Sequence, residues 1–476
     1  MEKITAQVKI EKTVFKEMQD KVNNILDLKK QIENVLEKET TKILEVILAG
    51  AISLDASDIH IEPEEEKVKT RVRIDGILYD VLFIEFKIYQ ALLSRIKILS
   101  GIKLNITKKA QDGRFTILID ELRSLSRRRD GRRNLFLRPS SPFAIARVVD
   151  ELRSSSPFAI ARVIEGGETE ARVSVLPSEY GESIVIRLLN PKELIKIEDL
   201  GVREEILGQL KKEIEKPNGM IIVTGPTGSG KTTTLYAVLK KVQKPGIKII
   251  TIEDPIEYHL EGISQTQVRP EKGYDFSNGL RAIVRQDPDV ILVGEIRDYE
   301  TAKIALQAAL TGHLVLTTLH TNDAAGTIVR LQSLGEKPIN IAPAINIAVA
   351  QRLVRRICKK CVKFSPPTEE ELQIFKKELG VLGKKIKIPK LSKNLKIPRV
   401  QGCKFCNFTG YKGRIGIFEF FLKDDEMENF ILKSPSITDL RKIARKKGMV
   451  LMREDGLIKV LQGMTTLEEI KRVTAS

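Results

Sequence analysis

A glycine-rich loop is the stretch of this chain best suited to chemistry. It reads Gly225-Pro226-Thr227-Gly228-Ser229-Gly230-Lys231-Thr232 and is followed by Thr233. The spacing G-x-x-x-x-G-K-T is that of a phosphate-binding loop (P-loop), whose backbone N–H groups surround the phosphates of a nucleotide. The Lys231 ammonium is expected at the terminal phosphates and the Thr232 hydroxyl at Mg²⁺. The loop therefore predicts a nucleoside triphosphate site.

The segments around this loop predict the elements that position it. Apolar residues 220–224 precede it and are suited to a buried strand, and residues 233–239 can open a helix whose dipole favours an anion. Further strand-like segments at 247–252, 290–293 and 313–320 alternate with helical patterns, which indicates a parallel sheet. Ligands of such sheets bind beyond the carboxyl ends of the strands.

Acidic residues follow two of these segments. Glu295 comes just after the 290–293 segment, where it can polarise the water that attacks the γ-phosphate. Gly294 stands where an aspartate usually precedes such a glutamate, so Mg²⁺ is expected to rely on Thr232 and on water. Glu253 and Asp254 offer a second acidic pair for water or metal. For Glu295, and likewise for Glu253 with Asp254, a capping or ion-pair role is the alternative.

Two of the four histidines flank one predicted strand. His313 and His320 lie seven residues apart, so they cannot share one face of a strand. We expect them at opposite ends, one near the γ-phosphate and one near a subunit boundary. A purely structural role is the alternative for either histidine.

The four cysteines form two C-x-x-C pairs. They are Cys358 with Cys361 and Cys403 with Cys406. Such twin pairs are typical of a four-thiolate zinc site, and a redox pair is the less favoured alternative. The long gap between the pairs predicts a small structure of its own.

Composition fits a globular protein of several domains. The chain has 476 residues, a net charge of +17 and few aromatic residues, so acidic partners are favoured but nucleic-acid binding is not indicated. Basic runs at 123–133 and 384–399 are interpreted as solvated loops. The first five residues lack the apolar stretch of a signal peptide, and the weakly apolar run 338–350 is too short to span a bilayer. We therefore expect a cytoplasmic protein.

The first 190 residues predict a separate mixed α/β region. Apolar residues at helical spacing between 22 and 35 predict an amphipathic helix, either packed on the body or offered to a partner, with a frayed leader as the alternative. Segments 68–74 and 77–83 flank Asp75-Gly76, which is a hairpin signal. A helix is expected near 89–99, and residues 190–200 are interpreted as a linker.

An internal duplication interrupts this region. Residues 140–148 recur unchanged at 155–163, and 120–124 recur at 150–154. Solenoid repeats are longer and need several copies. We interpret about 121–168 as a duplicated insertion in a loop, where extra length costs little. An arginine-rich docking segment is the alternative.

Several motifs together resemble the type II secretion and type IV pilus assembly ATPases, over roughly 41–120 and 169–476. The motifs are Ala56 to Pro63, Gly225 to Thr232, Thr251 to Glu257 (the aspartate box), Gly294 to Asp298 (Walker B), and Thr311 to His313 with Thr318 to Asn322 (the histidine box).

The resemblance implies a homohexameric motor that uses ATP, Mg²⁺ and Zn²⁺. A PAS-like N-terminal domain of one subunit closes over a RecA-like domain, where Glu253 and His313 assist Glu295. Arg114 and Arg172, matched by position, bring positive charge to the phosphates. A polytopic platform protein of the inner membrane is the implied partner, which means peripheral membrane association at the inner face. Retraction motors usually lack the four cysteines, so an assembly or secretion motor is favoured.

The expected organisation has five parts. They are a helical leader (1–40), a PAS-like α+β domain with the insertion (41–190), a RecA-like core (201–355), a four-cysteine zinc module (356–415) and a helical C-terminal part (416–476). The expected function is an ATP hydrolase that powers a type IV pilus or a type II pseudopilus. A DNA-uptake pilus motor, a DNA-translocating or helicase-type ATPase and an inactivated nucleotide-binding scaffold are the alternatives.

Overall fold

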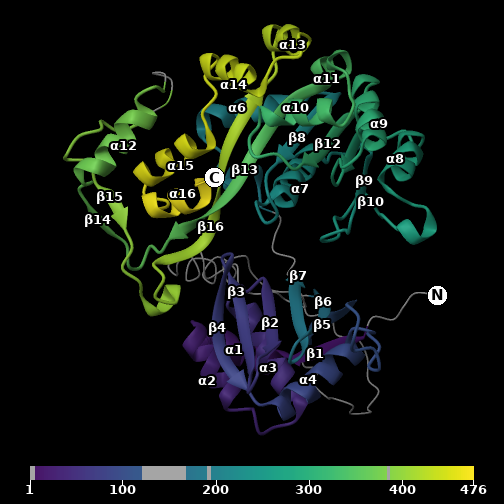
Figure 1. The fold of residues 1–476 in the computed structure, drawn as a ribbon, viewed down its shortest axis with the longest axis vertical. Helices are drawn as coiled ribbons and strands as arrows, with labels where there is room; N and C mark the ends of the chain where they lie inside the picture. Colours follow the sequence, from purple (N-terminus) through teal and green to yellow (C-terminus); the bar gives the residue numbers. More distant parts are fainter. Residues whose placement is uncertain (1–5, 121–167, 190–194, 383–385, 387, 476) are drawn as a thin grey trace, which may run out of the picture. The chain divides into compact units, whose positions relative to one another are not determined.

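The structure, a computed structural model, describes residues 6–120, 168–189, 195–382, 386 and 388–475. The chain divides into two compact units, Met1–Pro191 and Lys192–Ser476 (unit 1 and unit 2; Figure 1). Within the described ranges, no helix is long and apolar enough to cross a membrane. The duplicated insertion lies outside the described residues.

Unit 1 is built on a seven-stranded sheet with the order β1-β5-β6-β7-β2-β3-β4. Neighbouring strands are antiparallel except for β1, which pairs in parallel with β5. The predicted hairpin is confirmed, because Ile74 pairs with Ile77 across Asp75-Gly76. The strands are β1 (Gln7–Glu11), β2 (Asp58–Pro63), β3 (Val68–Ile74), β4 (Ile77–Ile84), β5 (Gln111–Asp120), β6 (Glu168–Ser178) and β7 (Gly181–Leu189).

The N-terminal residues belong to this unit. The helix predicted between residues 22 and 35 is confirmed as α2 (Ile25–Glu33), whereas β1 and α1 (Lys12–Lys21), which precede it, were not predicted. The chain leaves helical geometry at Val22, and the Asn24 side chain caps α2 by accepting from Asp27 N. Apolar residues from Val8 to Val35 are buried in one core with α3 (Thr40–Ser53) and α4 (Phe86–Leu99). Residues 6–35 are therefore not a frayed leader but part of the core of unit 1.

Unit 2 contains the predicted parallel sheet, with the order β10-β9-β11-β12-β8-β13-β16. Every pair is parallel except β13 with β16. Its strands are β8 (Gly219–Thr224), β9 (Ile249–Glu253), β10 (Ser264–Gln267), β11 (Val290–Val293), β12 (Leu314–Leu319), β13 (Ile345–Ile357) and β16 (Tyr411–Leu422). The helices α6 (Glu204–Ile214), α7 (Lys231–Val242), α8 (Phe276–Val284), α9 (Tyr299–Leu310), α10 (Gly326–Ser333) and α11 (Pro338–Ala344) accompany it. Residues on the two faces of this sheet are buried in two separate apolar cores.

The four-cysteine region is inserted between the two C-terminal strands of this sheet. Between β13 and β16 the chain forms β14 (Lys363–Ser365), α12 (Glu369–Leu379) and β15 (Ile397–Arg399), which confirms the expected small structure. α12 begins with a capping box of Thr368 and Glu371, and Arg399 pairs with Glu371 at 2.6 Å. β13 and β16 thus serve both the sheet and the cysteine region.

The C-terminal helices are docked by buried charges as well as apolar side chains. They are α13 (Asp425–Ile431), α14 (Ile437–Lys446), α15 (Met452–Leu461) and α16 (Leu467–Thr474). Asp455 of α15 is 1% exposed and accepts from Phe418 N of β16 at 2.9 Å, and Lys459 pairs with it. The mixed α/β fold is confirmed, whereas the PAS-like nature of unit 1 stays a prediction.

Candidate functional site

The P-loop joins β8 to α7, as predicted. All six residues of β8 are buried, and α7 begins at Lys231. Gly225, Gly228 and Gly230 have φ values of 145°, 79° and 87°, which side chains rarely adopt. A Cβ at Gly225 would also lie 2.4 Å from the carbonyl oxygen of Gln351. The loop therefore needs glycine both for its backbone conformation and for its contact with β13.

Gln351 is the main P-loop contact that the sequence reasoning missed. This β13 side chain is 2% exposed and its Nε2 donates to Ser229 O at 2.8 Å. Its Oε1 accepts from the Thr234 hydroxyl of α7 at 2.6 Å. One buried amide thus holds both the loop and the first turn of the helix. No motif marks it, because its role depends on the pairing of β8 with β13.

The loop has the donors that a triphosphate requires. Lys231 Nζ donates to Gly225 O at 2.8 Å and to Pro226 O at 3.2 Å, and the first N–H groups of α7 have no partner within the helix. Burial lowers the pKa of Lys231, and the charge of Glu295 acts in the opposite direction. The Ser229 hydroxyl is buried with no hydrogen-bond partner. These residues fit a bound polyphosphate, with the Thr232 hydroxyl as the Mg²⁺ ligand.

Glu295 lies between two basic side chains. Arg297 Nη2 donates to Glu295 Oε1, and His320 Nε2 lies 3.4 Å from Glu295 Oε2. The Glu295 side chain is 15% exposed, and its charge acts on Lys231. Glu295 therefore shares the carboxyl edge of the sheet with the P-loop, which is the arrangement needed to orient a water beside the terminal phosphate.

The two histidines do lie at opposite ends of β12, but the structure reverses the expected choice. His320 follows the strand and contacts Glu295, whereas His313 precedes it, with Nδ1 3.0 Å from Ala308 O. The carbonyl of His313 accepts from Gly219 N at the start of β8, the end opposite the P-loop. The expectation that His313 assists beside Glu295 is thus wrong for the site within one chain: His320 occupies that position.

Glu253 lies behind the P-loop helix. It is 3% exposed and accepts from Tyr236 of α7, from Thr251 at 2.6 Å and from Gln265 at 3.2 Å. Burial, reinforced by the Glu253 carboxylate, raises the pKa of Tyr236 well above its usual value. These contacts favour the alternative that Glu253 has a hydrogen-bonding role, whereas Asp254 is exposed.

The segment after β12 links the site to the rest of unit 2. Thr321 N donates to the Thr224 hydroxyl at 2.8 Å, directly before the P-loop. Asp323 pairs with Arg441 of α14, and Ala324 N donates to Glu419 at 3.0 Å. The segment from His320 to Ala324 therefore contacts Glu295, the P-loop strand and the C-terminal helices within five residues.

The four cysteine sulfurs lie within 4.8 Å of one another. Three Sγ–Sγ distances are 3.9, 3.7 and 3.7 Å, close to the value of about 3.8 Å that tetrahedral Zn–S bonds of ~2.3 Å impose. Cys406 Sγ also accepts from Cys403 N and from Gly410 N, both at 3.2 Å. The group fits a zinc ion, and none of the four is in a disulfide.

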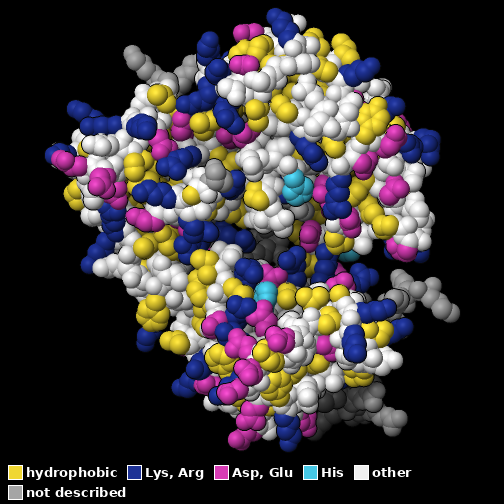
Figure 2. Space-filling view, in the orientation of Figure 1, with side chains coloured by type: hydrophobic (Ala, Val, Ile, Leu, Met, Phe, Trp, Pro, Cys, Tyr) yellow, Lys and Arg dark blue, Asp and Glu magenta, His cyan; other side chains and the backbone are white. Residues whose placement is uncertain are grey.

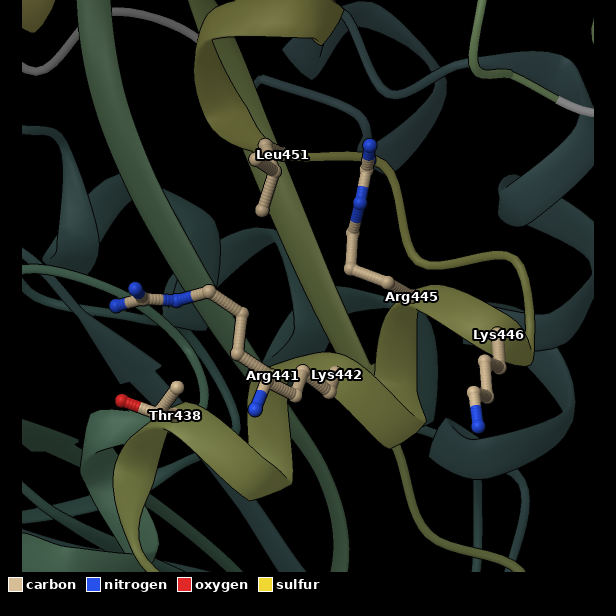
Figure 3. A pocket seen from close by; sticks show the side chains of 6 residues that line it. All are labelled: Thr438, Arg441, Lys442, Arg445, Lys446 and Leu451. Atoms are coloured by element: carbon tan, nitrogen blue, oxygen red, sulfur yellow. The ribbon is translucent and has the colours of Figure 1, made fainter.

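A pocket over α14 is not part of this site. It has a volume of about 360 Å³ and is lined by Thr438, Arg441, Lys442, Arg445, Lys446 and Leu451 (Figure 3). Its basic side chains point in different directions, and Arg441 and Arg445 are paired with Asp323 and Glu454. On the visible faces of both units, Lys and Arg are mixed with Asp and Glu (Figure 2), so the net charge forms no single basic surface there.

In unit 1, the structure brings the two predicted arginines together. Arg114 of β5 pairs with Arg172 of β6 in the strand register. Arg114 lies 3.6 Å and Arg172 3.9 Å from the same Glu170 carboxylate oxygen. Although they are 58 positions apart in the sequence, the two residues are direct neighbours in the sheet.

A family profile described as "Type II/IV secretion system protein" matches residues 34–129 and 151–472. This chain belongs to that family. It is 41% identical over 435 residues to the type IV pilus assembly ATPase PilB of Thermus thermophilus, covering 91% of this chain and 43% of that protein. It is 40% identical over 441 residues to the type II secretion system protein E of Xanthomonas campestris, covering 92% of this chain and 68% of the relative.

Solved structures show the same fold for members of this class. The ATPase DotB of Legionella pneumophila aligns with a TM-score of 0.58 and 21% identity, over 90% of this chain and 95% of DotB. The pilus retraction motor PilT with bound ADP aligns with a TM-score of 0.53 and 24% identity, over 92% of this chain and 96% of PilT. Of these proteins, PilB and DotB are named as ATPases, and the other two as a secretion system protein and a pilus retraction motor.

Proposed function

We propose that this protein is a cytoplasmic, homohexameric ATPase that powers the assembly of a type IV pilus or a type II secretion pseudopilus. The observation that carries the proposal is the position of Glu295 at the carboxyl edge of the sheet, with Arg297 and His320 beside it and an intact P-loop after β8, which is separated from the strand of Glu295 by β12 alone. The named relatives, a type IV pilus assembly ATPase and a type II secretion system protein, support the choice of machine.

In this proposal, unit 2 binds and hydrolyses the nucleotide. Lys231 moves from the loop carbonyls to the terminal phosphates, and the N-terminus of α7 stabilises their charge. Bound Mg²⁺, held by the Thr232 hydroxyl, would neutralise further phosphate charge. Glu295 orients the attacking water, and His320 fixes the carboxylate. Glu253 acts indirectly, by holding α7 through Tyr236.

The other elements have roles in assembly. Unit 1, proposed to be PAS-like, presents Arg114 and Arg172 to the phosphates of a nucleotide bound by a RecA-like unit 2. Closure of unit 1 over the nucleotide accompanies the power stroke. The four-cysteine region, with its zinc, is proposed to contact a polytopic platform protein at the inner face of the inner membrane.

The test is ATP turnover of the purified chain beside Glu295→Gln, with the oligomer mass followed by light scattering. We expect a hexamer whose Glu295→Gln variant still binds ATP but hydrolyses it at least about a hundredfold more slowly, because the water is no longer oriented. Glu300→Gln, an exposed acid on α9, is the control and should retain activity. Unchanged turnover in Glu295→Gln would overturn the proposal.

A DNA-translocating ATPase is the second candidate, which the net charge of +17 allows. For that function, DNA would stimulate turnover, with an apparent affinity that falls steeply as salt rises. No stimulation is expected from the motor proposed above.

A further inference from the structure

A single row of charged residues crosses the sheet of unit 1. In the strand register, Arg114 lies opposite Arg172, Arg172 opposite Arg187, Arg187 opposite Asp58, and Asp58 opposite Arg73. The row runs over β5, β6, β7, β2 and β3, and its members share one face because directly paired residues of neighbouring strands point to the same side. Four arginines and one aspartate thus form a continuous line.

This row lies on the polar face of the sheet. The residues that alternate with it, such as Phe115, Val173 and Ile186, are buried in the core on the opposite face. The side chains of Arg114 and Arg187 are 61% and 60% exposed, and that of Arg172 is 25% exposed. The arginines are therefore accessible to a ligand.

The arrangement is unfavourable for the sheet by itself. Like charges directly opposite each other destabilise a strand pair, and here three arginines stand side by side on β5, β6 and β7. A Glu170 carboxylate oxygen lies 3.6 Å from Arg114 and 3.9 Å from Arg172 and carries one negative charge beside three arginines. An anion laid across the row would relieve this repulsion.

Asp58 lies within the row, between Arg187 and Arg73, and contacts both. Its side chain is 7% exposed, and its Oδ1 accepts from Arg187 Nε at 3.0 Å. Its Oδ2 accepts from the Ser57 hydroxyl at 2.8 Å and lies 3.4 Å from Arg73 Nε. Because Asp58 binds Arg187 through Nε, it orients a guanidinium whose terminal nitrogens remain available for an oxyanion.

We infer that Arg187 is a third phosphate-binding arginine, held in position by Asp58, and that the row Arg114–Arg172–Arg187 binds the polyphosphate of a nucleotide. Strands lie about 4.8 Å apart, so three guanidinium groups cover about 10 Å, enough for adjacent phosphate groups. Arginine binds phosphate with paired hydrogen bonds, which a lysine cannot reproduce. This inference rests on the proposed function, because the nucleotide is the substrate of that reaction.

The first experiment compares steady-state ATP hydrolysis by the full chain with that of Arg187→Ala and Arg187→Lys. We expect kcat to fall at least tenfold in Arg187→Ala and to be only partly restored in Arg187→Lys. The matched control is Arg71→Ala, which removes an equal charge from the neighbouring row. Arg71 forms an ion pair with Glu62 and lies opposite His60 in the strand register. If wild type hydrolyses ATP and Arg187→Ala has the same kcat as Arg71→Ala, the inference fails while the proposed function stands.

The positioning role of Asp58 is tested by a double-mutant cycle. Asp58→Asn should lower kcat in the wild-type background but have no further effect in Arg187→Ala, because its contribution passes through that arginine. A purely structural role would lower activity equally in both backgrounds, and that result would overturn the assignment of Asp58.

A binding measurement separates the inference from the ATPase proposal. Inorganic tripolyphosphate is titrated by calorimetry into the full chain carrying Lys231→Ala, which disables the P-loop. Binding that falls at least fivefold on adding Arg187→Ala, but not on adding Arg71→Ala, supports the row even if wild type proves unable to hydrolyse ATP. Equal binding by the three chains, or none in the Lys231→Ala chain, would overturn it.

Discussion

The amide Nε2 of Gln351 donates to the carbonyl oxygen of Ser229 at 2.8 Å, so strand β13 holds the P-loop from the side. The same strand ends at Ile357, and the next residue is the first cysteine of the candidate zinc site. The nucleotide loop and the metal site are therefore connected by one strand of the central sheet.

Replacing Gln351 should weaken nucleotide binding. Gln351→Ala removes the donor to Ser229 and the acceptor for Thr234, so binding must reorder the loop, and we expect affinity to fall about tenfold, or ~1.4 kcal/mol. Titration with a fluorescent ATP analogue measures this, with the exposed Gln307→Ala of α9 as the control. Wild-type affinity in Gln351→Ala would show that the loop does not depend on this contact.

The two histidines of β12 should differ in their effect on turnover. His320→Ala leaves Glu295 without its neighbour at 3.4 Å, and we expect kcat to fall about tenfold while ATP binding persists. His313→Ala is the matched comparison, because His313 lies at the other end of the strand, and it should remain within about twofold of wild type. A larger loss in His313→Ala than in His320→Ala would contradict this placement.

The four cysteines should bind one zinc ion per chain. Elemental analysis of wild type is expected to give one zinc per chain, and Cys406→Ser should lose it and melt at lower temperature, because a structural zinc contributes directly to folding. Lys404→Ala, an exposed change inside the same C-x-x-C pair, should keep the metal. Zinc-free wild type with a disulfide between these cysteines would instead favour the redox alternative.

The C-terminal helices should become less stable in acid through Glu469. Burial by itself would raise the pKa of this fully buried carboxyl, but hydrogen bonds from Arg472 and Arg355 outweigh burial and hold the pKa below its usual value. A lowered pKa means that the stabilisation is present above about pH 4.5 and is lost as pH falls through the folded-state value.

Thermal melting at several pH values tests this linkage. At pH 7, Glu469→Gln should lose about 3 kcal/mol because Arg355 and Arg472 lose a fully buried charge partner. The difference from wild type should shrink as the pH falls below 4.5. Glu468→Gln, a 65% exposed neighbour, should have little effect at any pH. A Glu469→Gln deficit that stays constant with pH would show that the stabilisation is not electrostatic.

Local sequence patterns predicted the elements of unit 2 well. The P-loop, the parallel strands and the cysteine pairs are read from neighbouring residues, since strand burial, backbone conformation and metal-ligand spacing are encoded within a few positions. The β3–β4 hairpin was predicted for the same reason, from Asp75-Gly76 between two alternating segments.

Contacts between distant segments were not predictable in this way. The apolar residues from 22 to 35 predicted α2, but β1 was not predicted, because it forms by pairing with the distant strand β5. The expectation for His313 came from the resemblance and not from strand direction: ligands bind beyond the carboxyl ends of parallel strands, and His320 is the histidine that follows β12.

The sequence by itself determined the nucleotide loop, the four thiol ligands and the family. Only the tertiary structure decided which side chains meet them: Gln351 at the P-loop, His320 at Glu295, and Arg187 beside Arg172 and Asp58. The physical reason is that motif chemistry depends on spacing along the chain, whereas these contacts depend on strand order and register, which are set by packing of the whole sheet.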